Sequence, residues 1–85
     1  MARFLYFAWL RERLGKPAEE YILPESVTTV GQMIQHMRER GEPYATVLAD
    51  THLRVAVNQH YASPEVAVDN GCEIALFPPV SGGSS

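Results

Sequence analysis

Residues 72–83 read CEIALFPPVSGG, an apolar run followed by two prolines and two glycines. The segment Cys72 to Phe77 is predicted to be the last strand of a sheet. The prolines that follow it cannot donate hydrogen bonds to a sheet ladder, so the strand is expected to end there. We therefore divide the chain into a folded domain, residues 1–77, and a flexible C-terminal tail, residues 78–85.

The tail is suited to reaching into another protein. Pro78 and Pro79 favour a stiff polyproline path, and Gly82 and Gly83 have no side chains that could collide with the wall of a narrow channel. Because a chain extends at most about 3.3–3.6 Å per residue, the six residues from Pro78 to Gly83 span roughly 20 Å. A Gly-Gly-Ser-Ser ending is also typical of a linker remnant or a frayed terminus, and the tail alone leaves both interpretations open.

Composition limits the classes of function. With 85 residues the chain is expected to form one domain with one modest core. A net charge of −3, with one lysine and scattered arginines, argues against nucleic acid as the main partner. Cys72 is the only cysteine, which fits a reducing, cytoplasmic setting. No apolar run approaches the roughly 20 residues of a membrane span, so we expect no membrane contact.

The clearest element upstream is a helix that begins after Thr29. Thr29 and Gln32 form the pattern of a capping box, in which each side chain satisfies a free backbone N–H of the first turn. The apolar residues that follow recur at helical spacing and form one stripe: Val30, Met33, Ile34 and Met37. Gly41 is a natural stop for this helix.

The other segments predict a sheet for this helix to cover. Strands are expected over residues 2–9, 20–23 and 53–57, a helical turn over 10–14, and turns at 58–60 and 69–71. Residues 44–50 fit either a short helix or an irregular crossover, and residues 64–68 either a short strand or a loop. The first strand is apolar on both faces, so it should lie inside the sheet. The expected fold is α+β, a mixed sheet of four to five strands with one main helix packed across it.

Three segments taken together resemble one known family. They are LYFA at 5–8 with LRE at 10–12, AVNQ at 56–59, and NGCEIALFPPVSGG at 70–83. In this combination the whole chain resembles the β-grasp sulfur-carrier proteins, and within them the small subunits of molybdopterin synthases. The resemblance implies a ubiquitin-like β-grasp fold.

The resemblance also implies a chemistry for the tail. An activating enzyme similar to the ubiquitin E1 would use ATP to adenylate the carboxylate of Gly83, and a sulfur donor would convert the acyl-adenylate to a thiocarboxylate. The tail would then enter the large subunit of the synthase, and two sulfur transfers would build the dithiolene of molybdopterin. The carrier would bind no cofactor, would supply sulfur without catalytic groups of its own, and would assemble as a heterotetramer with two copies of each subunit.

The site residues follow from the same resemblance. Gly83 would carry the sulfur, and Gly82 would let the tail pass through the channel. Ordering the tail in a partner costs about 1–2 kcal/mol per residue, so an apolar docking patch should offset that cost. By the family pattern the partner interface comprises Phe7, Arg11, Tyr61, Phe77, Pro78, Pro79 and Val80. Taken alone, Phe7 could equally be core, and Arg11 an ordinary solvated charge.

Two features depart from the family, and the histidines carry no signal. The family ends at the second glycine, whereas this chain continues to Ser84 and Ser85. A protease that removes both serines would expose Gly83; otherwise this form is inactive or the serines are not native. Cys72 stands where the family commonly has aspartate, and we treat it as a small, partly buried residue. The three histidines lack ligand spacing, so no metal site is expected.

Three other functions remain open. The first is a sulfur carrier for another pathway, thiamin or tRNA thiolation, although thiamin carriers usually lack a middle segment as long as residues 41–52. The second is a ubiquitin-like modifier joined through Gly83 to lysines of target proteins. The third is a β-grasp interaction module with a passive tail.

Overall fold

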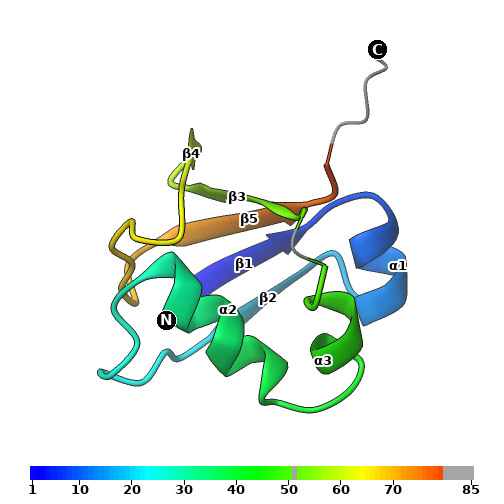
Figure 1. Ribbon diagram of the computed structural model, residues 1–85, viewed down its shortest axis with the longest axis horizontal. Coiled ribbons are helices and arrows are strands. Elements are labelled where there is room, and N and C mark those ends of the chain that lie inside the picture. The colour runs from blue at the N-terminus through cyan, green and yellow to red at the C-terminus, as the bar shows by residue number, and fades with distance from the viewer. Residues whose placement is uncertain (51, 80–85) are drawn as a thin grey trace.

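A computed structural model describes residues 1–50 and 52–79. Its sheet has five strands in the order β2-β1-β5-β3-β4, and the helices lie on one side of it (Figure 1). In chain order the elements are β1 (Ala2–Tyr6), α1 (Trp9–Leu14), β2 (Ala18–Tyr21), α2 (Val30–Arg38), α3 (Tyr44–Val47), β3 (Arg54–Val57), β4 (His60–Tyr61) and β5 (Glu73–Phe77). The sheet is mixed, because β1 and β5 run parallel and the other pairs are antiparallel. This confirms the predicted fold class.

The strand that leads into the tail lies at the centre of the sheet. β5 pairs with β1 on one side, where Phe4 is opposite Ile74, and with β3 on the other, where Val55 is opposite Leu76. A strand hydrogen-bonded on both edges cannot fray as an edge strand does. The point at which the chain leaves the sheet, after Phe77, is therefore fixed.

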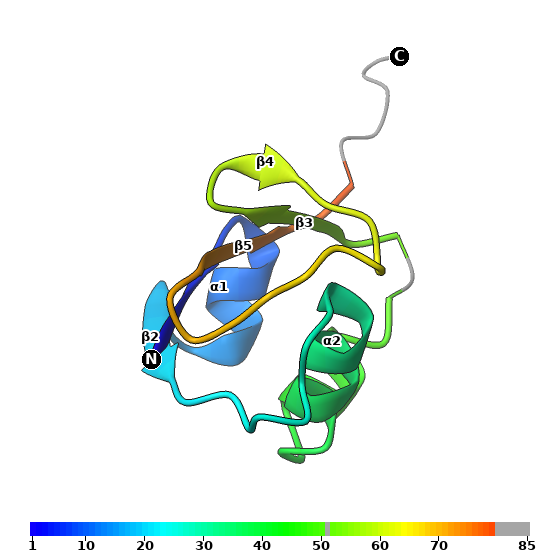
Figure 2. The ribbon, with the colours of Figure 1, turned by 90° about the vertical axis from the view of Figure 1, so that its left-hand side faces the viewer.

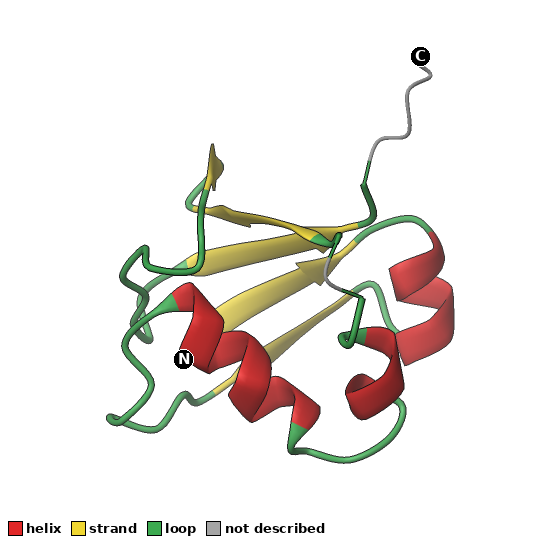
Figure 3. Ribbon diagram, viewed as in Figure 1, coloured by secondary structure: helices red, strands yellow, loops and turns green. Residues whose placement is uncertain are grey.

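The core lies between the sheet and α2 (Figure 3). Phe4 of β1 and Leu76 of β5 are 0% exposed, and so are Met33 and Met37 of α2. Fully burying side chains of this size contributes about 1.5–3 kcal/mol each. The predicted stripe of α2 is thus the core face, with Ile34 only partly buried at its side.

The start of α2 is capped, with one difference from the capping box we expected. The Thr29 hydroxyl accepts a hydrogen bond from the backbone N–H of Gln32 at 3.2 Å. The Gln32 side chain, however, accepts from the backbone N–H of Thr28 at 2.8 Å and not from that of Thr29. The extended backbone of Thr29 leads into the turn, and the reciprocal bond falls one residue earlier.

A partly buried carboxylate joins the sheet to the segment after α2. Glu19 of β2 accepts hydrogen bonds from the hydroxyl groups of Tyr6 and Tyr44 and from the guanidinium of Arg40, the last at 3.1 Å, and Lys16 lies 3.4 Å away. We call these five residues the Glu19 clamp. Burial alone would raise the pKa of Glu19, but the bonds from Tyr6, Arg40 and Tyr44 outweigh it and lower the pKa to about 2. The clamp thus holds an ionised carboxylate between β1, β2 and α3.

Several local predictions were wrong or incomplete. The first strand, expected over residues 2–9, ends at Tyr6, because Ala8 turns the chain into α1, which begins at Trp9. The second strand is Ala18–Tyr21 and not 20–23, because Glu19 is held in the clamp and Leu23 is buried beyond the strand end. The third strand, expected over residues 53–57, is Arg54–Val57, and its last three residues are all buried instead of alternating between buried and exposed. The turn expected at residues 69–71 forms without a positive φ at Asn70 or Gly71, whereas the turn between β3 and β4 has a positive φ at Asn58 and Gln59.

Residues 44–50 contain the short helix α3, one of the two alternatives left open by the sequence. Residues 64–68 form a loop that touches the start of α2 through one bridge, between Thr29 and Ala67. Within the described residues, no helix is long and apolar enough to cross a membrane.

Candidate docking face and tail root

The face of the sheet turned away from the helices carries the candidate site. Figure 2 shows the helices gathered on one side, with none drawn over the other. On this open face a row of apolar residues crosses the strands in register: Leu5 opposite Ala75, Ala75 opposite Ala56, and Ala56 opposite Tyr61. Three of the four are small or aliphatic, so the centre of the face is flat enough to lie against another protein.

Three aromatic side chains gather at the end of this face where the chain leaves the sheet. Phe7 follows β1, Phe77 ends β5, and Tyr61 belongs to β4. The Phe77 ring lies 6.3 Å from that of Phe7 and 5.8 Å from that of Tyr61, in edge-on and tilted arrangements. Phe7 is 45% exposed and Tyr61 is 76% exposed, so this aromatic patch is accessible. Exposed aromatics that contact one another are typical of interface anchors.

The backbone after β1 holds Phe7 at this position. The N–H of Phe7 donates to the carbonyl of Leu76 at 3.1 Å, which extends the pairing of β1 with β5 by one residue. Ala8 then adopts a φ of 56° and a ψ of −136°, a conformation that normally requires glycine. Strain of this kind costs on the order of 1–3 kcal/mol and concentrates at functional sites. Here it turns the chain sharply into α1 directly after the aromatic patch.

Of the predicted interface, the structure brings Phe7, Tyr61 and Phe77 together. Pro78 and Pro79 follow directly and are half-buried at the root of the tail. Arg11 lies exposed on α1, and within residues 1–50 and 52–79 its side chain makes no hydrogen bond or ion pair. Val80, Gly82 and Gly83 lie outside the described residues. The structure thus places the predicted patch beside the root of the tail.

Sequence reasoning missed two features of this face. Arg54 is exposed on β3, and its Cα is the register partner of Phe77, so its charge lies beside the patch. The flat centre made by Leu5, Ala56 and Ala75 was also missed. Alternation along the strands could have indicated it, but the sequence did not reveal which strands are neighbours.

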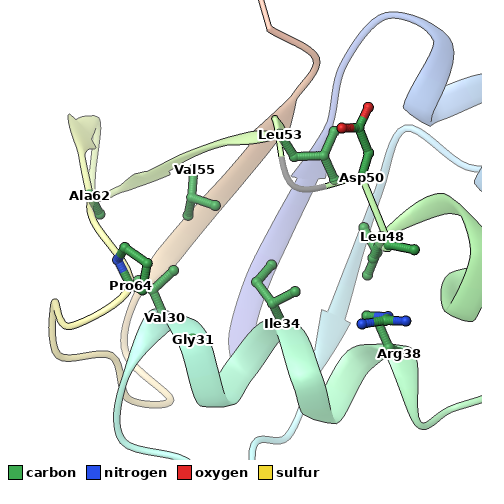
Figure 4. Close-up of a pocket in the computed structure, with 11 residues that line it drawn as sticks. Val30, Gly31, Ile34, Arg38, Leu48, Asp50, Leu53, Val55, Ala62 and Pro64 are labelled. Atoms are coloured by element: carbon green, nitrogen blue, oxygen red, sulfur yellow. The ribbon is translucent and has the colours of Figure 1, made fainter.

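The opposite side of the sheet contains a cavity of about 320 Å³ between α2 and β3 (Figure 4). Val30 and Ile34 line it from the helix, and Leu53 and Val55 line it from the strand side. Arg38 and Asp50 are its charged lining residues, and the described lining contains no cysteine, serine or histidine. The cavity therefore offers mainly apolar surface, with one carboxylate and one guanidinium in its lining.

The remaining reactive side chains are dispersed. The Cys72 thiol is half-buried, 3.5 Å from a carboxylate oxygen of Asp69 and 3.8 Å from the Asn58 amide. His36 shares a hydrogen bond of 2.8 Å with the Tyr21 hydroxyl, and His52 faces Asp50 at 3.4 Å. Across residues 1–50 and 52–79, no three His, Cys, Asp or Glu side chains are grouped to hold a metal ion. The open face thus contains the candidate site.

The strand order, the helix across one face and the C-terminal strand at the centre define a ubiquitin-like β-grasp protein. The ThiS family matches residues 4–83, and the chain belongs to that family. The match ends at Gly83, so Ser84 and Ser85 lie beyond it.

One relative and two solved structures are similar to this chain over nearly its whole length. The molybdopterin synthase sulfur carrier subunit of Haemophilus influenzae is 40% identical over 83 residues, which are 98% of this chain and 100% of the relative. A putative molybdopterin converting factor subunit 1 from Pyrococcus furiosus has the same fold, with a TM-score of 0.76 and 27% identity over 93% of this chain and 97% of that chain. SAMP1 from Haloferax volcanii has a TM-score of 0.73 and 27% identity over 96% of this chain and 98% of that chain.

Proposed function

We propose that this protein is the sulfur carrier subunit of a molybdopterin synthase and that Gly83 carries the sulfur as a C-terminal thiocarboxylate. The observation that carries the proposal is the aromatic patch of Phe7, Tyr61 and Phe77 at the end of the central strand, directly beside the root of the tail. The same conclusion is supported by a relative that is named a molybdopterin synthase sulfur carrier subunit and that aligns over its own full length and over 98% of this chain.

The proposed chemistry uses the tail and leaves the folded domain unchanged. A carboxylate is a poor acyl donor, so ATP first converts the Gly83 carboxylate to an acyl-adenylate on an E1-like activating enzyme. A sulfur donor displaces AMP and leaves a thiocarboxylate. The soft, ionised sulfur of that group attacks the pterin precursor held by the large subunit, and Gly83 is later released as an ordinary carboxylate. In this proposal the described residues bind the partner proteins and supply no catalytic group.

The folded domain would supply the binding energy that the tail lacks. Threading Val80 to Gly83 into a partner costs about 4–8 kcal/mol of backbone entropy. Aromatic anchors of the kind seen in the patch contribute about 2 kcal/mol or more each when an interface covers them. Three such anchors on a rigid sheet can offset the cost of threading. Pro78 and Pro79 reduce the cost further because their φ angles are already fixed.

We propose that Ser84 and Ser85 are removed before activation. With both serines present, the carbonyl of Gly83 is part of an amide, and the terminal carboxylate lies about 7 Å further along the chain. The family match that ends at residue 83 supports a carrier that ends at Gly83. Intact-mass analysis of the protein from cells that make the cofactor should find a main species ending at Gly83. A main species that keeps both serines would contradict this step.

The decisive experiment combines the Gly83-ended thiocarboxylate with a purified large subunit and the pterin precursor. Formation of the dithiolene is expected, and none should form with the Gly83-ended carboxylate or with the chain that retains both serines. A known carrier subunit serves as the positive control. If that control works and this thiocarboxylate yields no dithiolene, the proposal is wrong.

A second function has one specific observation in its favour. The fold matches SAMP1, and a related structure is described as a small archaeal modifier protein. A modifier would use the same activated Gly83, with a lysine amine of a target protein in place of the sulfur donor. Recovery of isopeptide-linked conjugates from cells would support that role, and their absence alongside dithiolene formation would leave only the carrier.

A further inference from the structure

We propose that Asn70 is a conditional deamidation site, which the folded protein keeps unreactive through its hydrogen bonds and which becomes reactive when the loop before β5 opens. Asn70 precedes Gly71 in the turn that leads into β5. In an Asn-Gly pair the backbone nitrogen of glycine can attack the asparagine side chain with little hindrance, because glycine has no Cβ. Sequence alone would therefore mark this pair as the chemically weakest point of the domain.

The reaction needs a free side chain and a free nitrogen. The nitrogen of Gly71 loses its proton and attacks Cγ of Asn70, and the bond from Cγ to Nδ2 breaks. Nδ2 leaves as ammonia with that proton, and a cyclic succinimide remains. Water then opens either carbonyl of the ring, which gives aspartate or isoaspartate. Water is the only co-reactant.

In the folded protein both atoms of the Asn70 amide group are engaged with one distant residue. Oδ1 accepts a hydrogen bond from the backbone N–H of Leu23 at 2.8 Å, and Nδ2 donates to the carbonyl of Leu23 at 3.0 Å. Leu23 is 2% exposed, so it cannot follow Asn70 outward. We call this pair of bonds the Asn70 strap. It must break before Cγ can rotate toward Gly71.

The attacking nitrogen is engaged as well. The N–H of Gly71 donates to the carboxylate of Asp69 at 2.8 Å, and the turn is closed by the N–H of Cys72, which donates to the Asp69 carbonyl at 3.2 Å. A carboxylate beside this N–H opposes loss of its proton, because the resulting anion would face a second negative charge. The two bonds of the Asn70 strap and the bond from the Gly71 N–H to Asp69 therefore separate the folded turn from the reactive geometry.

The product cannot restore the strap. A carboxylate at position 70 has no donor for the Leu23 carbonyl, and two oxygens would then face each other there. Isoaspartate in addition inserts a methylene into the backbone just before β5. β5 leads to the aromatic patch and the tail root. Deamidation after this turn opens would therefore change permanently the backbone just before that strand.

The test compares deamidation of Asn70 in folded and urea-unfolded protein at the same neutral pH and temperature, followed by peptide mass spectrometry. Asn58, which precedes glutamine, is the internal reference. We expect the folded protein to react at least about thirtyfold more slowly, a ratio equivalent to about 2 kcal/mol. Rates that agree within about threefold would overturn the proposal.

Two variants test separately the hydrogen bond of the Gly71 N–H and the attack by the Gly71 nitrogen. Asp69→Ala frees the Gly71 N–H and should speed deamidation in the folded state while leaving the rate in urea unchanged within about twofold. Gly71→Ala should slow the reaction in urea; a Cβ at Gly71 would have Asp69 Oδ1 at 3.4 Å as its nearest neighbour, so the fold should accept it. If Gly71→Ala leaves the rate in urea unchanged, attack by this nitrogen is excluded.

Hydrogen exchange gives a measurement that does not depend on any variant. If the reaction requires the strap to open, the deamidation rate of Asn70 should rise in proportion to the hydrogen-exchange rate of the Leu23 amide when urea is added below the unfolding transition. Deamidation that stays constant while Leu23 exchange accelerates tenfold would contradict the proposed mechanism.

Discussion

The two faces of the sheet use the same strands, but only one of them is covered. Leu76 and Phe77 are neighbours on β5; Leu76 points into the core with no exposed surface, whereas Phe77 packs among exposed aromatics on the open face. The covered face is closed by α2 and the Glu19 clamp, which hold the fold together. The open face has aromatic rings that stabilise little in the free protein. Stability and docking are therefore expected to respond to different residues.

The largest expected effect is on the covered face. Leu76→Ala should lower the free energy of unfolding by about 3–4 kcal/mol, because it leaves a cavity in the centre of the core. Phe77→Ala, one residue away, should cost only about 1 kcal/mol, the value of its ring contacts. Urea unfolding of both variants measures the difference. Equal losses would show that Phe77 is a core residue and that the two faces are not distinct.

The Glu19 clamp should give the next largest effect. Glu19→Gln removes the charge that accepts from two tyrosines and Arg40, and the expected loss is about 2–3 kcal/mol. The pKa of Glu19 in the folded protein, about 2, lies below its ordinary value of 4.5. The contribution of its charge is therefore complete above about pH 4.5 and is lost as the pH falls toward 2.

The difference in unfolding free energy between the wild type and Glu19→Gln should accordingly shrink over that pH range. Glu20→Gln is the matched control, since Glu20 is its exposed neighbour with one long ion pair to Arg3 at 3.9 Å. It should change stability by less than about 0.5 kcal/mol. A gap between the wild type and Glu19→Gln that stays constant from neutral pH down to pH 2 would contradict the assigned role of the carboxylate.

The sequence could predict features that depend on adjacent residues, but not features that depend on contacts between distant segments. Local signals were sufficient for the α2 stripe and for the C-terminal strand that ends before the prolines, because helical spacing and prolines act on adjacent residues. The expected stop at Gly41 was placed too late, since α2 ends at Arg38 with Glu39 as its C-cap. The second strand was misplaced by two residues because Tyr21 to Leu23 looks like a strand locally. Its true position depends on the Glu19 clamp, in which directly bonded residues lie up to 28 positions apart in the sequence.

The candidate site, too, could be predicted only in part from the sequence. The prolines and glycines predicted a tail that could reach a partner, but they also fitted a linker remnant or a frayed terminus, and the family resemblance favoured the first interpretation. The meeting of Phe7, Tyr61 and Phe77 followed only from the family resemblance, because it depends on strand order. Arg54 was missed since nothing in its neighbours indicates that it pairs with Phe77. The Asn70 strap was missed because a side chain that bonds to a backbone 47 residues away leaves no periodic pattern.

On the open face, binding should change while stability does not. Tyr61→Ala should weaken affinity for the large synthase subunit by about ten- to a hundredfold, as expected for an interface anchor. Because Tyr61 is 76% exposed, unfolding free energy should change by less than about 1 kcal/mol. Calorimetric titration of the two subunits measures the affinity. An unchanged affinity would exclude Tyr61 from the interface, and His60→Ala is the matched control on the same strand.

The smallest effect is expected at Arg11. It is exposed on α1 and makes no ion pair within the described residues, so Arg11→Ala should leave stability within about 0.5 kcal/mol. If it only steers the partner, affinity should fall by about threefold or less, mainly through a slower association rate, and the loss should vanish at high salt. Arg54→Ala, beside Phe77, should cost more and should persist in salt. A tenfold loss for Arg11→Ala at high salt would instead place Arg11 inside the interface and extend the docking face from the sheet onto α1.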